Sequence, residues 1–112
     1  MSSAQMNRAL VLEAPERTAD GAGGFSEVWT VMGMLWAAIR AGTGREAGIA
    51  GLSLSTVPYR ITVRAAPVGA PSRPVAGQRL RSGARVFRIL AVTEADAAAR
   101  FLTCIAREEL VT

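Results

Sequence analysis

The amino-acid sequence predicts a mainly β domain, with about six short strands arranged as a small antiparallel barrel or a sandwich. Three observations support this prediction. Apolar and polar residues alternate in Tyr59–Arg64, the segment 27–40 begins with β-branched and aromatic residues, and Gly- or Pro-rich breaks recur between short apolar runs. The 112 residues are expected to form a single domain, 1–112. Because half of the residues are hydrophobic and only 5% are aromatic, its core should consist mostly of Val, Leu, Ile and Ala.

The N-terminal part is predicted to hold a short strand between two irregular segments. Residues 1–7 are expected to form a disordered tail. Arg8–Glu13 is expected to be a strand that Pro15 ends, because proline cannot donate a backbone hydrogen bond. Residues 16–24 are expected to form a polar loop whose glycines permit positive φ angles.

The segment 27–40 is predicted to be a long strand with a bend at Gly33, although the run 32–39 would also suit a helix. Trp29 and Trp36 are seven residues apart, so a regular strand would place them on opposite faces. A bulge at Gly33 would bring them to one face. Either one tryptophan is core and the other partly exposed, or the exposed one anchors a subunit interface.

The segment 41–56 is expected to be a long flexible loop. It contains Gly42, Gly44, Gly48 and Gly51 among small and apolar residues. A short helix over residues 45–54 is the alternative, and interior glycines would destabilise it by about 1 kcal/mol each.

The segment 59–64 is predicted to be a half-buried antiparallel strand. Its apolar face would carry Tyr59, Ile61 and Val63, and its outer face Arg60, Thr62 and Arg64.

The C-terminal part is predicted to contain a hairpin, a short helix and a last strand. Pro67, Pro71 and Pro74 indicate an irregular loop before residues 78–81 and 86–93, which are expected to pair around a turn at 82–84. Residues 94–99 favour a short helix with Thr93 as its N-cap. Residues 101–107 are expected to form the closing strand.

The composition argues against catalysis and against a bound cofactor or metal. The chain has no His, which removes the commonest general base, and its single cysteine, Cys104, lies in an apolar run. All 13 basic residues are Arg, and the net charge is +4. The absence of Lys reflects either codon composition or a surface suited to bidentate contact with carboxylate or phosphate. The glycine tract 21–24 is not followed by the Lys of a phosphate-binding loop.

No membrane segment is expected. The N-terminus lacks the apolar region of a signal peptide, and the apolar run 31–39 is shorter than the roughly 20 residues that cross a bilayer. The protein is expected to be made in the cytoplasm and kept there until it is assembled.

In this order and spacing, several short motifs are similar to one known family. The chain resembles the small head–tail joining proteins of long-tailed bacteriophages, which include head–tail adaptors and head-closure (stopper) proteins and have relatives in gene transfer agents. The resemblance covers roughly residues 8–107, and it rests on Leu10–Leu12, Gly23-Gly24 with Trp29, Trp36–Ile39, Gly44–Glu46, Arg60–Arg64, Gly83–Ile89 and Cys104.

The resemblance implies a β-barrel subunit that is made in the bacterial cytoplasm and forms a homo-oligomeric ring in the neck of a virion or phage-like particle. The ring would join the portal or adaptor protein on the head side to the tail terminator on the tail side, and double-stranded DNA would pass through it. A hexamer is expected because tails are commonly sixfold, with a dodecamer as the alternative. In resembling proteins a loop helps to block the channel, and the segment 41–56 would take that role. The candidate interface or channel residues are Trp29, Trp36, Arg45, Glu46, Arg60, Arg64, Arg85 and Arg88.

Two other interpretations remain open. One stays within the same particle, as an adaptor ring or a tail-end component. The other is a small barrel that binds nucleic acid without sequence preference, and its affinity would fall steeply with salt. The few aromatic residues argue against the second, because they do not form a stacking platform.

Overall fold

The computed structural model describes residues 6–43 and 57–109, which contain six β-strands and no helix. The prediction of a mainly β fold is therefore confirmed. The strands are β1 (Arg8–Ala19), β2 (Phe25–Ala41), β3 (Pro58–Arg64), β4 (Arg79–Ser82), β5 (Arg85–Glu94) and β6 (Phe101–Glu109).

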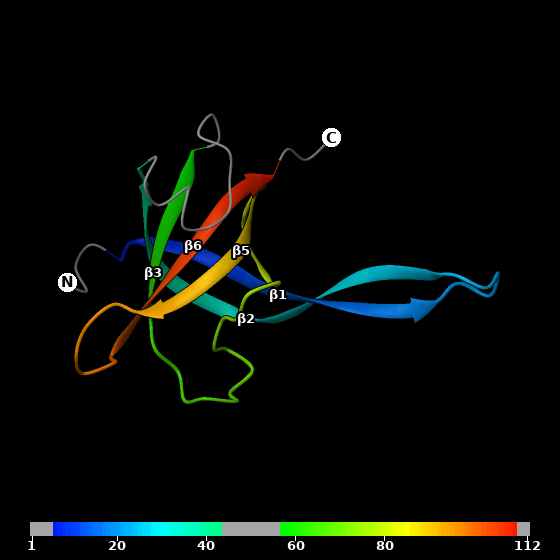
Figure 1. Ribbon diagram of the computed structural model, residues 1–112, viewed down its shortest axis with the longest axis horizontal. Helices are drawn as coiled ribbons and strands as arrows, with labels where there is room; N and C mark the ends of the chain where they lie inside the picture. Colours follow the sequence, from blue (N-terminus) through cyan, green and yellow to red (C-terminus); the bar gives the residue numbers. More distant parts are fainter. Residues whose placement is uncertain (1–5, 44–56, 110–112) are drawn as a thin grey trace.

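The six strands form a closed barrel in the order β1-β2-β3-β6-β5-β4, and β4 pairs back onto β1. Every pairing is antiparallel. Figure 1 shows β3, β5 and β6 crossing obliquely above the first two strands. Because the sheet is closed, the barrel itself has no open strand edge. Of the two architectures that the sequence allowed, a barrel and a sandwich, the fold is the barrel.

The barrel interior is filled by apolar side chains from all six strands, as the alternating pattern predicted. Phe87 is the one aromatic residue in this buried cluster and contacts the Tyr59 ring edge-to-face, with 5.3 Å between the ring centroids. The cluster consists of Leu10, Leu12, Ala37, Ile61, Val63, Leu80, Phe87, Ile89, Leu102, Cys104 and Ala106. A core rich in small aliphatic residues follows from the composition.

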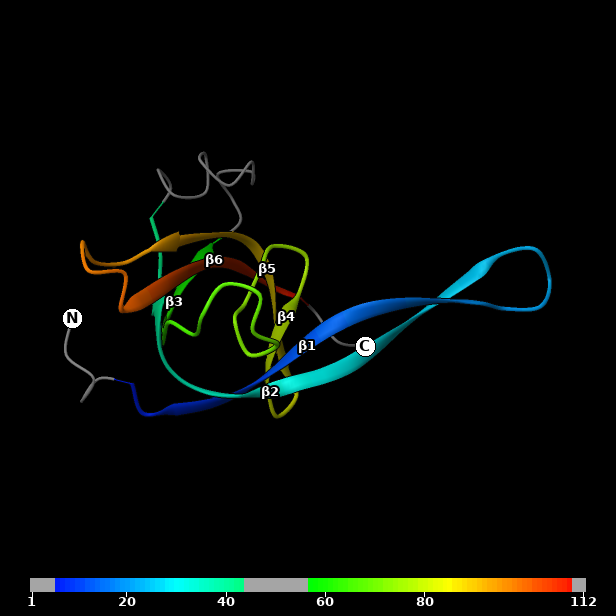
Figure 2. The ribbon, with the colours of Figure 1, turned by 90° about the horizontal axis from the view of Figure 1, so that it is seen from below.

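Beyond the barrel, β1 and β2 continue as a two-stranded projection that we call the arm, residues 14–31. Pairing of β4 with β1 stops at Glu13, and pairing of β3 with β2 is confined to Ala37–Ala41. The arm strands therefore pair only with each other. At the tip, the Asp20 carboxylate accepts hydrogen bonds from the backbone N–H groups of Ala22 and Gly24, at 2.8 and 3.0 Å. Figures 1 and 2 show the arm, in blue and cyan, extending along the longest dimension of 49 Å.

The arm corrects the prediction that Pro15 ends the first strand and that residues 16–24 form a loop. Instead, β1 runs through Pro15 to Ala19, and only the turn at its end is irregular. Proline is tolerated because this part of β1 has a neighbour on one side only, so a missing N–H need not break a ladder.

A β-bulge at residue Met32 links the arm to the barrel. Leu12 lies opposite Gly33 and Glu13 opposite Val31, so Met32 has no residue facing it. Gly33 beside it has φ of 157°, a conformation that L side chains rarely adopt. The predicted bend at Gly33 and the strand interpretation of the run 32–39 are both confirmed.

The bulge places both tryptophans on one face of the sheet. Trp29 lies opposite Pro15, and Trp36 lies opposite Ala9. Pro15 and Ala9 are an even number of residues apart on β1, which has no extra residue, so they share a face. This is the outer face, because Leu10 and Leu12 between them point into the core. Trp36 is the exposed tryptophan, at 56%, and Trp29 is half-buried.

The C-terminal half matches the predicted strands but not the predicted helix. β4 and β5 form the expected hairpin around Gly83-Ala84. Instead of a helix over 94–99, Glu94 ends β5 and residues 95–100 form the turn to β6, where the Asp96 carboxylate accepts hydrogen bonds from the backbone N–H groups of Arg100 and Phe101 at 2.9 and 3.0 Å. Ala99 has a positive φ of 57°, which a continuing helix would not allow.

Two predicted irregular segments are only partly described. In the segment 41–56, Ala41 ends β2 and the N–H of Gly42 donates to the carbonyl of Pro58 at 2.7 Å; residues 44–56 lie outside the described part. In the expected tail 1–7, Met6 is buried against Ala38 and Phe101 on the outside of the barrel. Among the described residues no helix is long and apolar enough to cross a membrane.

Candidate interaction surfaces

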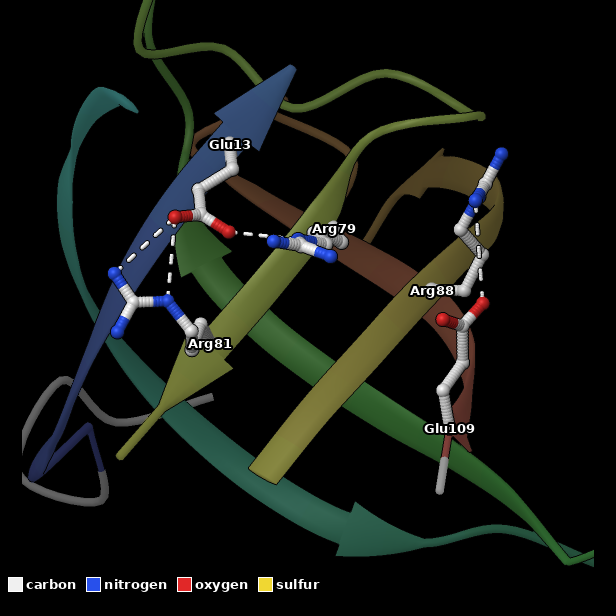
Figure 3. Close-up of polar contacts among 5 residues, drawn as sticks. All are labelled: Glu13, Arg79, Arg81, Arg88 and Glu109. Atoms are coloured by element: carbon white, nitrogen blue, oxygen red, sulfur yellow. Dashed lines mark hydrogen bonds and ion pairs between the residues drawn. The ribbon is translucent and has the colours of Figure 1, made fainter. Parts of the chain in front are cut away.

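Glu13 is a buried carboxylate on the outer wall of the barrel, held between two arginines of β4 (Figure 3). Arg79 Nε donates to Glu13 Oε1 at 2.7 Å, and Arg81 lies within 3.1–3.2 Å of Oε2 through Nη2 and Nε. Strand register explains the arrangement: Arg79 lies opposite Glu13, and Arg81, two residues further along β4, faces the same way. Only 5% of Glu13 is exposed, so it is a buried charge with two partners.

The two arginines determine the charge state of Glu13. Burial alone would raise the pKa of the carboxyl, but the hydrogen bonds and charges of Arg79 and Arg81 outweigh it and hold the pKa below its usual value. Glu13 is therefore ionised at neutral pH.

Trp29 packs against the same wall at the root of the arm. The guanidinium of Arg79 lies 4.1 Å from the centre of the Trp29 ring, and that of Arg88 lies 5.1 Å from it. Arg88 sits opposite Arg79 across β4 and β5, and its Nη1 is 3.9 Å from Oε1 of Glu109 (Figure 3). Two adjacent cations are tolerated because a ring face and two carboxylates surround them. The arginines thereby fix the arm root to the barrel.

Arg85 closes one end of the barrel. It makes a bidentate pair with Glu108, at 2.8 and 3.1 Å, and its guanidinium lies 4.9 Å from the Phe87 ring centre. The hydrogen bond between them raises the pKa of Arg85 and lowers that of Glu108, in each case against an opposing contribution from burial. This pair shields the end of the core and stays charged across the neutral range.

An open groove with a volume of about 340 Å³ lies beside Trp36, and we call it the Trp36 groove. Its lining combines apolar side chains with one cation: Met6, Met34, Leu35, Trp36 and Arg64. Arg64 also lies over the Phe101 ring, 5.5 Å from its centre. Exposed Trp36 and Met34, at 56% and 59%, make this an apolar patch on the outer wall of the barrel.

The structure brings some of the predicted site residues together and separates others. Trp29 and Arg88 meet at the arm root, Trp36 and Arg64 line one groove, and Arg85 lies at the barrel end. Arg60 and Arg64 both lie on the outer side of β3, as expected, with Arg60 half-buried opposite Arg40. Arg45, Glu46 and the predicted loop glycines Gly44, Gly48 and Gly51 lie outside the described residues.

Sequence reasoning missed Glu13 and Arg79. The available signal was a single carboxylate within the apolar run Leu10–Ala14, where a charge is unexpected unless it is paired. The partners of Glu13 lie 66 and 68 residues further along the chain, so the ion pairs could not be predicted from local sequence patterns.

The surfaces show contact chemistry rather than a reaction centre. Burial raises the pKa of the Cys104 thiol to about 12, so the thiol is not a nucleophile at neutral pH. In the described segments no three His, Cys, Asp or Glu side chains gather as a metal site. The closed barrel, the projecting arm and the exposed aromatic groove are features typical of a small structural protein that contacts other macromolecules.

The chain belongs to the phage head completion protein family, whose sequence model matches residues 1–109. It is similar to a chain in the virion of a native gene transfer agent particle, with 50% sequence identity and a TM-score of 0.74 over 95% of this chain and 96% of that one. It also has the fold of a Shigella flexneri 2a protein of known solution structure, with 24% identity and a TM-score of 0.70 over the full length of both chains. No match was found among curated proteins. The family is a structural one, which agrees with the prediction that the chain is not an enzyme.

Proposed function

We propose that the protein is a head-closure (stopper) subunit, which forms a ring in the neck of a phage-like particle between the portal or adaptor complex and the tail. The observation that carries the proposal is the near full-length similarity, at 50% identity, to a chain of a gene transfer agent virion, together with membership of the head completion family. The ring would be a hexamer matched to a sixfold tail, retain packaged DNA and pass it on release.

The physical properties of the chain support a place in such a ring. A net charge of +4, carried entirely by arginines, suits a subunit near double-stranded DNA, and arginine contacts phosphate without reading sequence. The arm strands have unpaired edges beyond the barrel, and a repeated contact between copies can cover such edges.

The alternative within the same particle is an adaptor ring or a tail-end component. An experiment that separates these roles is electron microscopy of particles made without this protein. Filled heads without tails support a joining role at the neck, and empty tailless heads support closure. Particles that keep both tails and DNA would refute the proposal, and intact filled heads carrying malformed tails would favour the tail-end role.

The second alternative, a non-specific nucleic-acid-binding barrel, is tested by the salt dependence of DNA binding by the isolated chain. Such a barrel would bind duplex DNA with an affinity that falls roughly 10³-fold between 50 and 200 mM salt. We expect no such binding, because most of the arginines on the described barrel wall are paired with carboxylates or aromatic rings.

A further inference from the structure

We propose that the tip of the arm of one copy docks into the Trp36 groove of the next copy, so that a single contact repeats around the ring. The inference rests on the proposed function only in requiring that copies of this chain meet in a ring. It assigns the two surfaces that meet and the chemistry of their contact.

Both surfaces expose large apolar side chains. Of the eight large hydrophobic side chains exposed in the described segments, five belong to β2: Phe25, Val28, Val31, Met34 and Trp36. Phe25, near the arm tip, is 63% exposed, and the guanidinium of Arg17 lies over one face of its ring, 4.5 Å from the ring centre. The Trp36 groove offers a largely apolar recess on the barrel, lined by methionines, which adapt readily to an inserted ring, and by Trp36, which offers an aromatic surface.

The arm and the rest of the chain carry opposite net charges. Residues 14–31 contain three carboxylates and one Arg, a net charge of −2, while the whole chain carries +4, which leaves +6 for the remainder. Glu27 lies two residues from Phe25 and faces the same side of the arm. In the described part of the chain Glu27 has no ion pair. Arg64 lines the groove, and within those same residues it has no carboxylate within 4.0 Å.

The arm tip and the Trp36 groove lie toward opposite ends of the molecule. Figures 1 and 2 both show the arm projecting from one end of the barrel, with β3 and the start of β1 at the other. An arm therefore cannot reach the groove of its own copy. A contact between two different surfaces is heterologous, and it builds rings or filaments rather than isologous dimers.

Crosslinking in assembled particles tests the contact. Ala19 lies opposite Phe25 on the arm and is exposed, so Ala19→Cys places a thiol at the tip without removing the aromatic side chain. Met34→Cys places a second thiol at the groove. The native Cys104 is buried and stays silent. With a short bismaleimide, the double variant should give covalent multimers up to the closed ring, and each single variant should give monomer only.

Several outcomes would overturn the inference. Incorporated double variant that stays monomeric shows that the tip and the groove do not meet. Multimers from Ala19→Cys alone indicate that arms contact each other. A crosslink to another particle protein assigns the arm to a different partner. In all three cases the protein is still in the particle, so the proposed neck function survives, whereas that function fails if particles without the chain keep tails and DNA.

Charge reversal gives an independent readout. Glu27→Arg or Arg64→Glu alone should reduce incorporation into particles by about tenfold or more, because like charges would face each other across the contact. The combined variant should recover most of the loss. Glu94→Arg, at an exposed acidic position on the barrel, is the matched control and should leave incorporation unchanged. Unaltered incorporation of both single variants, or no recovery in the combined one, contradicts the pairing.

Discussion

Replacing Glu13 by Gln is expected to destabilise the protein by about 2 kcal/mol at pH 7. The change keeps the shape of the side chain but removes the charge that faces Arg79 and Arg81. Hydrogen bonds to charged groups contribute about 1.5–3 kcal/mol each, and this is reduced here because the arginine side chains remain 22% and 39% exposed. The free energy of unfolding, from urea titration followed by circular dichroism, measures the difference.

The pH dependence of this difference follows from the lowered pKa of Glu13. A carboxyl whose pKa is lowered in the folded state contributes its full stabilisation at pH values above its pKa in the unfolded chain, which is near 4.5. This contribution is lost as the pH falls through the pKa of the folded state. The other paired carboxyls contribute equally in the wild type and in the variant. Subtracting the two free energies of unfolding at each pH therefore isolates the contribution of Glu13. The gap between wild type and variant should therefore be full at pH 7 and close progressively below about pH 4.5.

The matched control is Glu16→Gln, the same chemical change three residues away on the same strand. Glu16 is exposed and has no ion pair within the described segments, so the change should be worth less than about 0.5 kcal/mol. A gap for Glu13→Gln that persists unchanged at pH 3, or one no larger than that of the control, would refute the reasoning.

Three further outcomes are expected. Phe87→Ala should lower the free energy of unfolding by about 3–5 kcal/mol because the ring fills the barrel, whereas exposed Phe25→Ala should lower it by less than about 1 kcal/mol; equal effects would contradict the assigned core. The Cys104 thiol, with a pKa raised to about 12 by burial, should resist a thiol reagent at pH 8 and react once urea unfolds the chain, and rapid labelling of native protein would show an accessible thiol. Gly33→Ala should destabilise by about 1 kcal/mol or more because of the positive φ, a loss that thermal unfolding would detect and that an unchanged midpoint would disprove.

Strands in which apolar and polar residues alternate clearly could be predicted from the sequence, because successive side chains point to opposite faces of the sheet and only one face is buried. Tyr59–Arg64 became β3, with Ile61 and Val63 fully buried inside. The turn at Gly83-Ala84 was equally readable, since Gly83 adopts the positive φ that its residue type permits. These are local signals, and they do not depend on where a strand sits in the sheet.

The arm and the β5–β6 turn could not be predicted because they depend on non-local circumstances. A proline ends a strand that is paired on both sides, but it can be accommodated in a strand that is paired on one side only. The arm part of β1 pairs only with β2, and the residues around Pro15 do not indicate this. The alanine-rich run 94–99 favours a helix locally, but the pairing of β5 with β6 on either side of it requires a tight turn. The Asp96 carboxylate stabilises this turn by accepting hydrogen bonds from the backbone N–H groups of Arg100 and Phe101. Likewise, Trp29 and Arg88 could be named as candidates, but the Glu13 network beside them joins strands far apart in sequence.

The bulge at Met32 decides which side chains the particle can meet. If Met32 took a regular place in β2 and the bulge were absent, the arm face that carries Phe25 and Trp29 would continue through Leu35, and Trp36 would turn into the barrel. The interior has no room for it, since its neighbours there are Ala37 and fully buried leucines. With the bulge, Leu35 packs against the core and Trp36 joins Phe25, Trp29 and Met34 on the outer side. The bulge thus combines a closed core with an apolar outer stripe that runs from the arm to the groove, and copies would use such a stripe if the arm of each one reaches the next.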